Sequence, residues 1–351
     1  MHLELKMMKN EKIKQDYKRL WHICFQDTDE FTEFYFKRKF TPENCSTIYE
    51  NGQLQSALLM LPYSIHYYGE DLEASYVSGA CTLPEARGKG SMRKLLSDSL
   101  KTMQERGFAF SVLIPQEEWL YDYYQTFDYM PVFQYSLNVY FAVNKHFSTN
   151  VKVVSQEEAN KLTQELYEYL NKEMRKYALS IQHDLGDFKS ILEDLYISNG
   201  KLLIYRHPDG QLGGIAFTVN NGSYIKAYEV VADSIEEKQV LLTAAACIWE
   251  NPCIKYKDIA QSSLPILKGG MARIINAKKV LDIYASKFPE QTGTVRLTDN
   301  ILPSNNGYYQ LSEGKCIFSE YSDLPVDYKF TIRELTEKLF PNPAYMSLML
   351  D

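Results

Sequence analysis

The chain has 351 residues, of which 45% are hydrophobic and 24% are charged, and its formal net charge is −7. This length predicts two or three domains, and the composition is that of a soluble globular protein. The acidic balance excludes a general nucleic-acid binder, which carries a basic face. The first residues include Glu4 and lack the apolar stretch of a signal peptide, and the run from Leu241 to Trp249 is too short to cross a membrane. We therefore expect a cytoplasmic protein without nucleic-acid or membrane partners.

Cysteine and histidine spacing argues against a metal centre. The six cysteines contain no CxxC pair, and the six histidines do not cluster. A zinc site requires ligands at short spacings. We expect reduced, mostly buried thiols and no metal cofactor.

Helix and strand signals alternate through the first 145 residues. Asp27-Thr28-Asp29-Glu30 has the composition of a capped helix start, and Asn51-Gly52 is a typical hairpin turn between two β-rich runs. Helices are predicted at 16–25, after Thr28, at 91–106 and at 117–127. Strands are predicted at 45–50, 53–64, 73–83, 108–114 and 131–141. The first segment is therefore a mixed α/β layer.

The loop Arg87-Gly88-Lys89-Gly90 joins the strand at 73–83 to its helix. Glycines let a backbone approach a ligand closely, and the free amides of a helix N-terminus attract anions. Arg87 and Lys89 add positive charge. The loop fits a pyrophosphate, but neither a Walker A loop nor a GxGxxG fingerprint. By itself it is equally compatible with an exposed basic turn that caps a helix.

The next hundred residues repeat this scheme without the loop. Helices are predicted at 156–177, 188–198 and 234–249, and strands at 201–206, 213–219 and 224–231. Where the first copy has its basic loop, this one has Ala232-Asp233-Ser234-Ile235-Glu236-Glu237. These acidic side chains would repel a pyrophosphate, so we expect no cofactor in the second copy.

The third segment is predicted to be a smaller α+β unit. It has helices at 277–287 and 331–339, the second with a Thr331/Glu334 capping box, and strands at 294–298, 307–312 and 315–319. Its last six residues are mostly apolar, although chain ends are normally polar and frayed. We expect this tail to be buried. The predicted domains are 1–145, 146–268 and 269–351.

The first domain resembles the GCN5-related N-acetyltransferase (GNAT) superfamily. The glycine loop is followed some thirty residues later by Tyr123-Tyr124-Gln125-Thr126-Phe127-Asp128-Tyr129. Arg87 and Gly90 match the superfamily motif Q/R-x-x-G-x-G/A, whereas Met92 departs from it. The resemblance implies acetyl-CoA as cosubstrate, with contacts from Ala80, Cys81, Thr82, Arg87, Gly88, Lys89, Gly90, Ser91 and Met92.

The whole chain resembles the enhanced-intracellular-survival (Eis) type of acetyltransferase. Two such domains, the second without the motif, precede Met271-Ala272-Arg273-Ile274-Ile275-Asn276 and Val295-Arg296-Leu297-Thr298-Asp299. The resemblance implies two tandem GNAT-like domains followed by a sterol-carrier-protein-like domain. It also implies a homo-oligomer, hexameric by family resemblance, and members of this family tolerate a large aliphatic residue at the position of Met92.

The resemblance further implies the catalytic groups. Tyr124 would be the general acid, since a phenol with a pKa near 10 suits a leaving thiolate whose conjugate acid is near 8.5. The base would be the C-terminal carboxylate of Asp351, its pKa raised by burial and by the neighbouring side-chain carboxylate. The alternatives are that Tyr124 only packs and that the tail only stabilises an interface.

Phe25 and Asp27 would bind the acceptor amine, because aromatic and acidic groups together suit a cation. A helix-capping role is equally compatible with Asp27, and Cys81 fits a buried core thiol better than an acylated nucleophile. The favoured function is transfer of acetyl from acetyl-CoA to a primary amine, small or peptidyl. A non-catalytic CoA- or lipid-binding protein and a protein-lysine acetyltransferase remain alternatives.

Overall fold

The computed structural model describes residues 2–143, 148–261 and 263–350, with side chains described from residue 10 onward. Its contacts divide the chain into two compact units. The first unit comprises Met1–Val132 and Gly270–Phe340, and the second comprises Phe133–Gly269 and Pro341–Asp351. Each unit is therefore built from two separate stretches of sequence.

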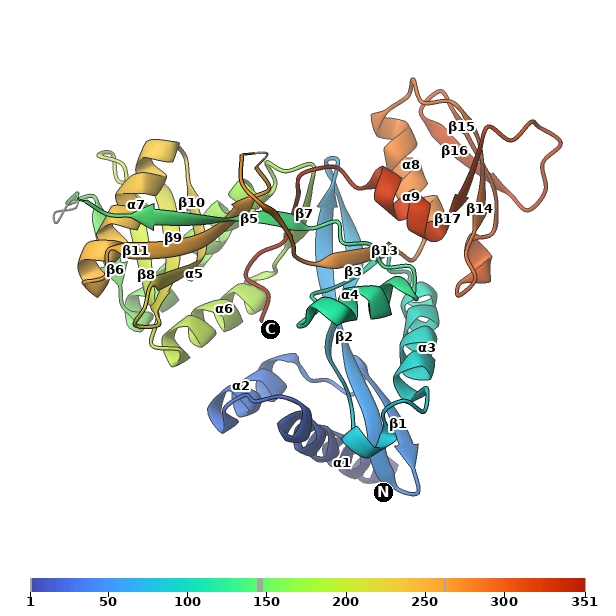
Figure 1. Cartoon of the computed structure of the whole chain (residues 1–351), viewed down its shortest axis with the longest axis horizontal. Helices are drawn as coiled ribbons and strands as arrows, with labels where there is room; N and C mark the ends of the chain where they lie inside the picture. The colour runs from blue at the N-terminus through green and yellow to red at the C-terminus, as the bar shows by residue number, and fades with distance from the viewer. Residues whose placement is uncertain (1, 144–147, 262, 351) are drawn as a thin grey trace. The chain divides into compact units, whose positions relative to one another are not determined.

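The N-terminal stretch of the first unit forms a mixed sheet with helices (Figure 1). Strand order is β13-β4-β3-β2, with β1 added to β2. Only β3 and β4 run parallel to each other; the other pairs are antiparallel. The elements are α1 (His2–Cys24), α2 (Asp29–Lys39), β1 (Cys45–Glu50), β2 (Gln53–Tyr67), β3 (Glu70–Thr82), α3 (Ser91–Glu105), β4 (Phe110–Leu113) and α4 (Glu118–Gln125).

The C-terminal stretch of the first unit contributes an edge strand and a second sheet. Strand β13 (Met271–Ile274) pairs with β4, as Arg273 lies opposite Ser111. The second sheet has the order β16-β15-β14-β17. Its elements are α8 (Ala277–Lys287), β14 (Gly293–Thr298), β15 (Gly307–Ser312), β16 (Lys315–Ser319), β17 (Tyr328–Thr331) and α9 (Ile332–Leu339). The predicted capping box of Thr331 and Glu334 is confirmed at the start of α9.

The second unit contains a seven-stranded sheet with the order β12-β5-β11-β10-β9-β8-β6. Strands β7 and β18 pair in parallel. The elements are β5 (Gln134–Phe141), β6 (Val151–Val154), α5 (Gln156–Met174), β7 (Leu179–Gln182), α6 (Leu185–Ile197), β8 (Lys201–Arg206), β9 (Leu212–Asn220), β10 (Ile225–Ala232), α7 (Ile235–Trp249), β11 (Cys253–Ile259), β12 (Ile266–Lys268) and β18 (Ala344–Tyr345).

The predicted mixed α/β fold is confirmed. Two strands, however, pair with strands that the predicted domains place elsewhere. The run at 131–141 was expected to close the first domain. Instead β5 pairs with β11 from Tyr135 to Phe141 and with β12 from Gln134 to Ser136. Residues 271–274, which the predicted domains place at the start of the third, form β13 and pair with β4 of the first sheet. Both exchanges join strands far apart in sequence, which local patterns do not reveal.

The main core of the first unit lies between β2, β3 and α3. Leu58 and Met60 of β2 alternate toward a buried cluster that includes Leu96 and Leu100 of α3. Helix α1 packs on the same two strands, and Figure 1 shows it on the side opposite α3. The amphipathic α3 therefore buries one face and leaves its charged face in solvent, which fixes its N-terminus beside the end of β3.

The C-terminal tail is ordered within the second unit. Tyr345 Oη donates to Glu229 Oε2 across 2.7 Å, and the Ser347 hydroxyl donates to the same oxygen. Tyr345 also stacks on Tyr177 with ring centroids 4.5 Å apart. Leu350 is buried, as its apolar character predicted. The predicted base, Asp351, lies outside the described residues.

Within the described residues, no helix has both the length and the hydropathy that a membrane span requires.

Candidate active site

Strands β3 and β4 pair for only three residues and then separate. The parallel pairing runs from Ala74 to Tyr76 of β3, and the six residues of β3 after Tyr76 have no partner in β4. The β2 pairing shifts register at the same place, because Ala57 lies opposite Cys81 while Leu59 lies opposite Ser78. β3 advances three residues where β2 advances two, so one extra residue bulges from β3 where the strands diverge and leaves main-chain groups of β3 available to a ligand.

The bulge contains Gly79 in the left-handed region, with φ +60°. A Cβ atom there would lie 2.3 Å from the Trp21 ring and 2.6 Å from Tyr17 Oη. The Tyr17 hydroxyl donates to the Gly79 carbonyl across 2.7 Å. Only glycine meets both the backbone and the space requirement, so α1 clamps the bulge directly. Gly79 was not predicted as a site residue, although a glycine inside a strand pattern is a signal for a bulge.

The basic loop follows the free end of β3 through a short 3-10 turn, Pro84–Ala86. Gly88 and Gly90 have φ values of +75° and +84°, and Gly90 is the N-cap of α3. A Cβ at either glycine would meet nothing within 4 Å, so the backbone angle rather than crowding calls for glycine. The first turn of α3 contains no acidic residue. Its free amides therefore face a purely basic loop, which suits an anion.

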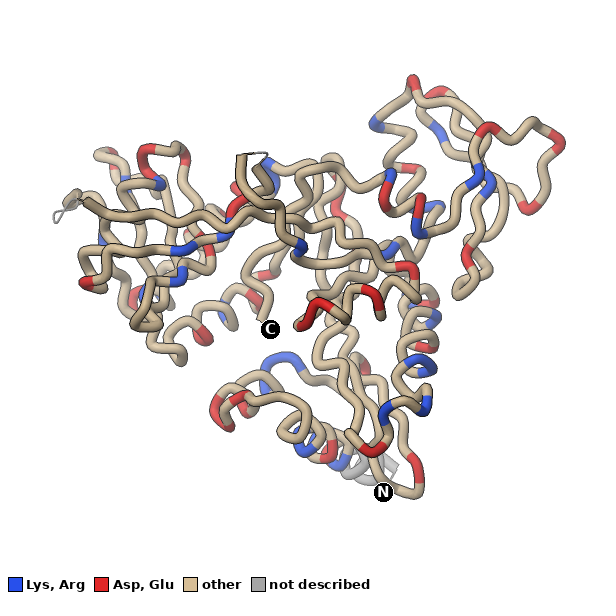
Figure 2. Tube along the Cα trace, in the orientation of Figure 1, with Lys and Arg blue, Asp and Glu red and all other residues tan. Residues whose placement is uncertain are grey.

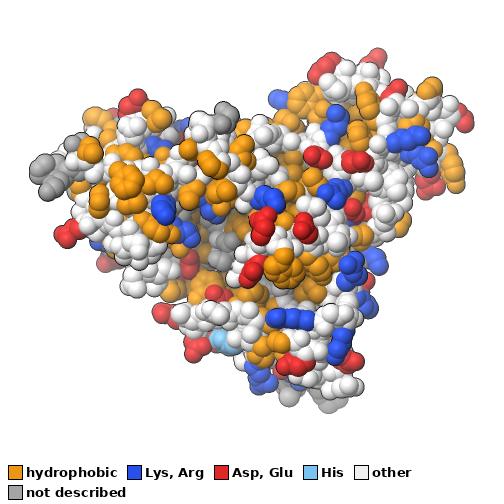
Figure 3. Space-filling view, in the orientation of Figure 1, with side chains coloured by type: hydrophobic (Ala, Val, Ile, Leu, Met, Phe, Trp, Pro, Cys, Tyr) orange, Lys and Arg blue, Asp and Glu red, His pale blue; other side chains and the backbone are white. Residues whose placement is uncertain are grey.

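Basic side chains gather around this loop. Arg87 and Lys89 are exposed, as are Arg93 and Lys94 in the first turns of α3. Figure 2 shows Lys and Arg along the N-terminal part of α3, and the space-filling view shows basic side chains on the surface there (Figure 3). The predicted phosphate-binding residues are thus brought together, on one helix start, in an exposed position.

Arg87 also contacts the end of β3 and a thiol. Its Nε donates to the Thr82 carbonyl across 3.2 Å, and its Nη2 lies 3.9 Å from Cys24 Sγ. A hydrogen bond from the Cys81 thiol, together with Arg87, lowers the pKa of Cys24 to about 6. Burial raises the pKa of Cys81, which favours its assignment as a core thiol. The low-pKa Cys24 was not predicted, because its partners come from β3 and the loop.

Tyr124 lies in α4 and belongs to the same buried cluster as Val77 of β3, with Ala80 packed against it. Burial raises the pKa of Tyr124 above its usual range. Its ring makes edge contacts with Tyr123 and Tyr129, at centroid distances of 5.5 and 6.0 Å. The phenol therefore borders the region where β3 leaves β4. Met92 also packs against this cluster, so its large side chain has a place in the core.

The predicted acceptor residues lie at the end of α1. Trp21 Nε1 donates to Asp27 Oδ2 across 2.8 Å, and the Trp21 and Phe25 rings lie 4.6 Å apart. Asp27 does not cap α2; that role belongs to Thr28, which accepts from the Phe31 amide. Phe25, Asp27 and the bulge are therefore linked through one indole, that of Trp21.

The corresponding junction of the second unit, between β10 and α7, is occupied by an ionic cluster. His207 lies between Asp233 and Glu237, with Nε2 3.1 Å from one carboxylate and Nδ1 3.2 Å from the other. Tyr169 donates to the second oxygen of Asp233 across 3.0 Å. Ser234 caps α7 by accepting from the Glu237 amide. The helix start that would face a phosphate thus carries carboxylates that already have cationic and hydroxyl partners.

Comparison with known proteins supports this reading of the first unit. Residues 5–132 match the family model described as an acetyltransferase (GNAT) domain. Among curated proteins, none matches the sequence.

Solved structures match almost the whole chain. A conserved protein from Enterococcus faecalis has 15% identity and a TM-score of 0.73, covering 93% of this chain and 87% of that one. A GCN5-related N-acetyltransferase from Anabaena variabilis has 16% identity and a TM-score of 0.72, covering 96% and 97%. The Eis1 protein from Mycobacterium abscessus has 14% identity and a TM-score of 0.62, covering 90% and 88%. At these identities the likeness concerns the fold. We therefore identify residues 5–132 as a match to the acetyltransferase (GNAT) domain family, within a chain whose fold resembles that of GCN5-related N-acetyltransferases.

Proposed function

We propose that the chain transfers an acetyl group from acetyl-CoA to a primary amine at the end of β3. The observation that carries this proposal is the convergence of three features on one strand. The freed main chain of β3 suits a pantetheine arm, the basic loop after it suits the pyrophosphate, and Tyr124 borders the strand from α4. Arg87, Lys89 and the first amides of α3 would hold the phosphates.

In the proposed reaction the amine nitrogen bonds to the acetyl carbon, the carbon–sulfur bond breaks, and Tyr124 donates its proton to the leaving sulfur. Because burial raises the pKa of Tyr124, the phenol stays protonated at neutral pH and can act as an acid. Burial also raises the pKa of a leaving thiol in the same site, so the match between the two groups is partly retained. Main-chain donors at the bulge would polarise the thioester carbonyl.

The direct test is a panel of primary amines with acetyl-CoA, with released thiol as the readout. Tyr124→Phe should lower kcat by roughly 100-fold or more, the scale of general acid catalysis, while acetyl-CoA binding stays nearly unchanged. Tyr123→Phe on the same helix is the matched control and should keep its rate. Full turnover by Tyr124→Phe would remove Tyr124 as the acid, and the absence of thiol release with every amine would remove the proposed activity.

We further propose the terminal carboxylate of Asp351 as the base that takes the amine proton. The proposal is supported by the preceding part of the tail, which Tyr345 and Ser347 anchor to Glu229. Removing Asp351 alone leaves these anchors intact. The truncated protein should lose most of its rate at neutral pH and keep its melting temperature. A full rate in the truncated protein would exclude the carboxylate as base.

A lipid-binding role for residues 270–340 has less support. A cavity of about 240 Å³ in this region is lined by Gln104, Asn276, Lys278, Ser304, Asn305, Tyr309 and Phe318. Five of these seven side chains are polar, whereas a hydrophobic ligand requires a mainly apolar wall.

A further inference from the structure

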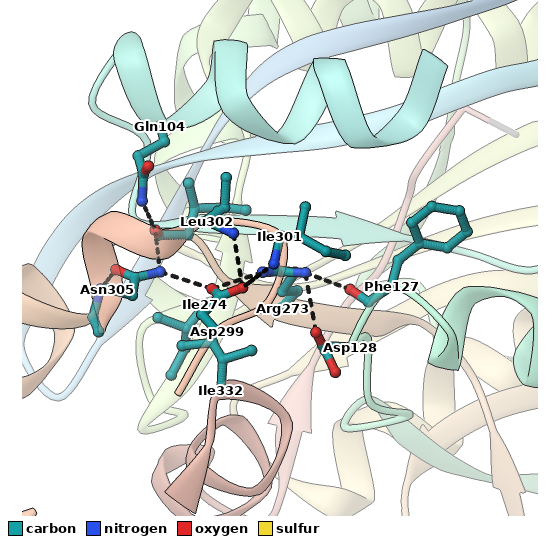
Figure 4. Close-up of polar contacts among 12 residues, drawn as sticks. Gln104, Phe127, Asp128, Arg273, Ile274, Asp299, Ile301, Leu302, Asn305 and Ile332 are labelled. Atoms are coloured by element: carbon teal, nitrogen blue, oxygen red, sulfur yellow. Dashed lines mark hydrogen bonds and ion pairs between the residues drawn. The ribbon is translucent and has the colours of Figure 1, made fainter. Parts of the chain in front are cut away.

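A buried arginine connects the C-terminal stretch of the first unit to the turn that follows α4. Arg273 of β13 is fully buried, with 0% of its surface exposed. Its Nη2 donates to both carboxylate oxygens of Asp299, across 2.6 and 2.7 Å. Its Nη1 donates to the Phe127 carbonyl across 2.6 Å and lies 3.5 Å from Asp128 Oδ2. Figure 4 shows the guanidinium between the two segments.

The carboxylate of Asp299 is held by groups of its own segment. It accepts from the amides of Ile301 and Leu302 and from Asn305 Nδ2, across 2.9 to 3.0 Å. Asn305 also donates to the Ile275 carbonyl, which accepts from Gln104 of α3 as well. Hydrogen bonds from its own segment thus hold the carboxylate of Asp299 in place, and the ion pair with it leaves the guanidinium of Arg273 little freedom to move.

The orientation of the guanidinium favours the contact with Phe127. A fork-shaped ion pair places two guanidinium nitrogens, such as Nε and Nη2, on the two carboxylate oxygens. Here one nitrogen takes both oxygens of Asp299, Nε is buried without a hydrogen-bond partner in the described structure, and Nη1 is directed at the Phe127 carbonyl. A buried unpaired N–H is costly. The guanidinium therefore lacks a contact between Nε and Asp299, while its Nη1 donates to the turn that contains Phe127.

That turn determines where Tyr124 lies. The amides of Phe127 and Tyr129 both donate to the Tyr124 carbonyl, across 2.9 and 3.3 Å. Asp128 between them has φ +63°, a conformation that needs support from its surroundings. Helix α4 has only eight residues, too few to be stable alone. Its last turn therefore takes its position from whatever holds residues 126–129.

A second arginine from the same stretch contacts the same end of α4. Arg333 of α9 donates through Nη2 to Gln125 Oε1 across 3.0 Å, and its Nε lies 3.1 Å from Met130 Sδ. The two arginines come from different elements, β13 and α9, and contact positions on both sides of Phe127. Two contacts from separate elements to the same short turn argue against an incidental contact between the segments.

We propose that Arg273, fixed by Asp299, is a positioning residue that sets the place of Tyr124 at the reaction site, with Arg333 as a second support. The proposal rests on the proposed function, in which Tyr124 is the acid. Under this proposal, residues 270–340 position the acid of the first unit, although they contribute no group to the proposed reaction.

The decisive experiment is a double-mutant cycle between Arg273→Met and Tyr124→Phe. Arg273→Met alone should lower kcat by about 10- to 100-fold, the scale of a small displacement of a reacting group, and leave the Kd of acetyl-CoA nearly unchanged. In the Tyr124→Phe background it should lower kcat by no more than about 2-fold, since the acid is already absent. Equal losses in both backgrounds would overturn the proposal.

Arg333→Met keeps the proposal testable if Arg273→Met does not fold, since Arg333 is only partly buried. It should lower kcat in the same direction and less strongly. Arg296→Met, an exposed arginine of β14, is the matched control and should leave kcat unchanged. An unchanged kcat in Arg333→Met would overturn the support assigned to Arg333.

Hydrogen exchange separates this proposal from the proposed function. Arg273→Met should speed exchange at the amides of Phe127 and Tyr129 whether or not Tyr124 is the acid. Faster exchange together with an active Tyr124→Phe variant would contradict the role of Tyr124 as acid but support the role of Arg273 in holding the turn. Unchanged exchange together with a slow Tyr124→Phe variant would contradict the role of Arg273 and support Tyr124 as the acid.

Discussion

The two units contain the same strand–helix junction in opposite chemical states. In the first unit β3 pairs with β4 for three residues and separates; in the second β10 pairs with β11 from Ile225 to Ala227 and separates. Both freed strands carry a bulge. The first leads into a basic glycine loop, whereas the second leads into Asp233 and a serine cap. The backbone of the two junctions is therefore alike, and the charge at the helix start is what distinguishes the proposed cofactor site from its counterpart.

The freed strands also differ in what they contact. Glu229, just past the bulge of β10, is buried and accepts from Tyr345 and Ser347 of the tail. Burial raises the pKa of this carboxyl. The tail thus binds, within the second unit, a position equivalent to the one where the first unit is proposed to bind acetyl-CoA. At the first junction we propose that a ligand binds, whereas the second junction contacts the C-terminal tail of the protein itself.

The largest effect on the difference between the two junctions is expected from removal of the positive charge of Arg87. Arg87→Ala should weaken acetyl-CoA binding by about 2 kcal/mol, or roughly 30-fold, because hydrogen bonds to charged groups contribute on that scale. Isothermal titration gives the Kd directly. Lys101→Ala, on the far part of α3, is the control and should bind normally. Unchanged binding in Arg87→Ala would mean that the phosphates lie elsewhere.

The same arginine should control the reactivity of Cys24. With the pKa of Cys24 at about 6, alkylation by iodoacetamide should reach half its maximal rate near pH 6 in the wild type. Arg87→Ala should move that midpoint upward and slow labelling at pH 6 by several-fold. Peptide mass spectrometry identifies the site. Cys45, whose pKa burial raises to about 12, is the internal control and should react slowly. A wild-type midpoint near that of a free thiol would contradict the assignment.

An effect of intermediate size is expected from backbone strain in the glycine loop. Gly90→Ala places a side chain at φ +84°, where the surroundings leave space but the conformation costs about 1 kcal/mol. Gly52→Ala, in the hairpin turn at φ +78°, carries the same backbone cost. Both variants should lose similar stability in urea, but only Gly90→Ala should also weaken acetyl-CoA binding. Equal binding by both variants would argue that the loop does not contact the ligand.

The smallest effect is expected at the ionic cluster of the second unit. The hydrogen bond to Asp233 raises the pKa of His207, so the folded state binds a proton more strongly than the unfolded state. This contribution to stability is fully present below the unfolded pKa of about 6.5 and is lost as pH rises through the folded pKa. His207→Gln should therefore lower Tm slightly in acid, less at pH 8, and leave acetyl-CoA binding unchanged. A loss of binding would show that the two junctions are coupled.

Most local elements follow from sequence, and most of their partners do not. Asn51-Gly52, the periodic face of α3 and the Thr331 capping box each depend on neighbouring residues, and all three predictions are confirmed. The pairing of Met271–Ile274 with β4 depends on contacts between distant residues, and no local pattern encodes it. For the same reason the sequence grouped residues 131–141 with the first segment, whereas β5 pairs with β11.

The candidate site divides in the same way. The loop from Arg87 to Gly90 was predicted because its residues are consecutive and carry their own chemistry. Cys24 and Arg273 were missed as site residues because their properties come from partners on other elements, namely Arg87 for the thiol and Phe127 for the guanidinium. Gly79 lies between these cases: its position in a strand was visible, but the Trp21 ring above it was not.

The pairing of β13 with β4 has a consequence for the order of events on the ribosome. A chain emerges from its N-terminus, so β4 is made long before residues 270–340 are available to cover its edge. Until then an apolar strand edge stays open, as is common in aggregation-prone nascent chains. The first unit, whose sequence begins first, can therefore finish folding only after nearly all of the second has been synthesised.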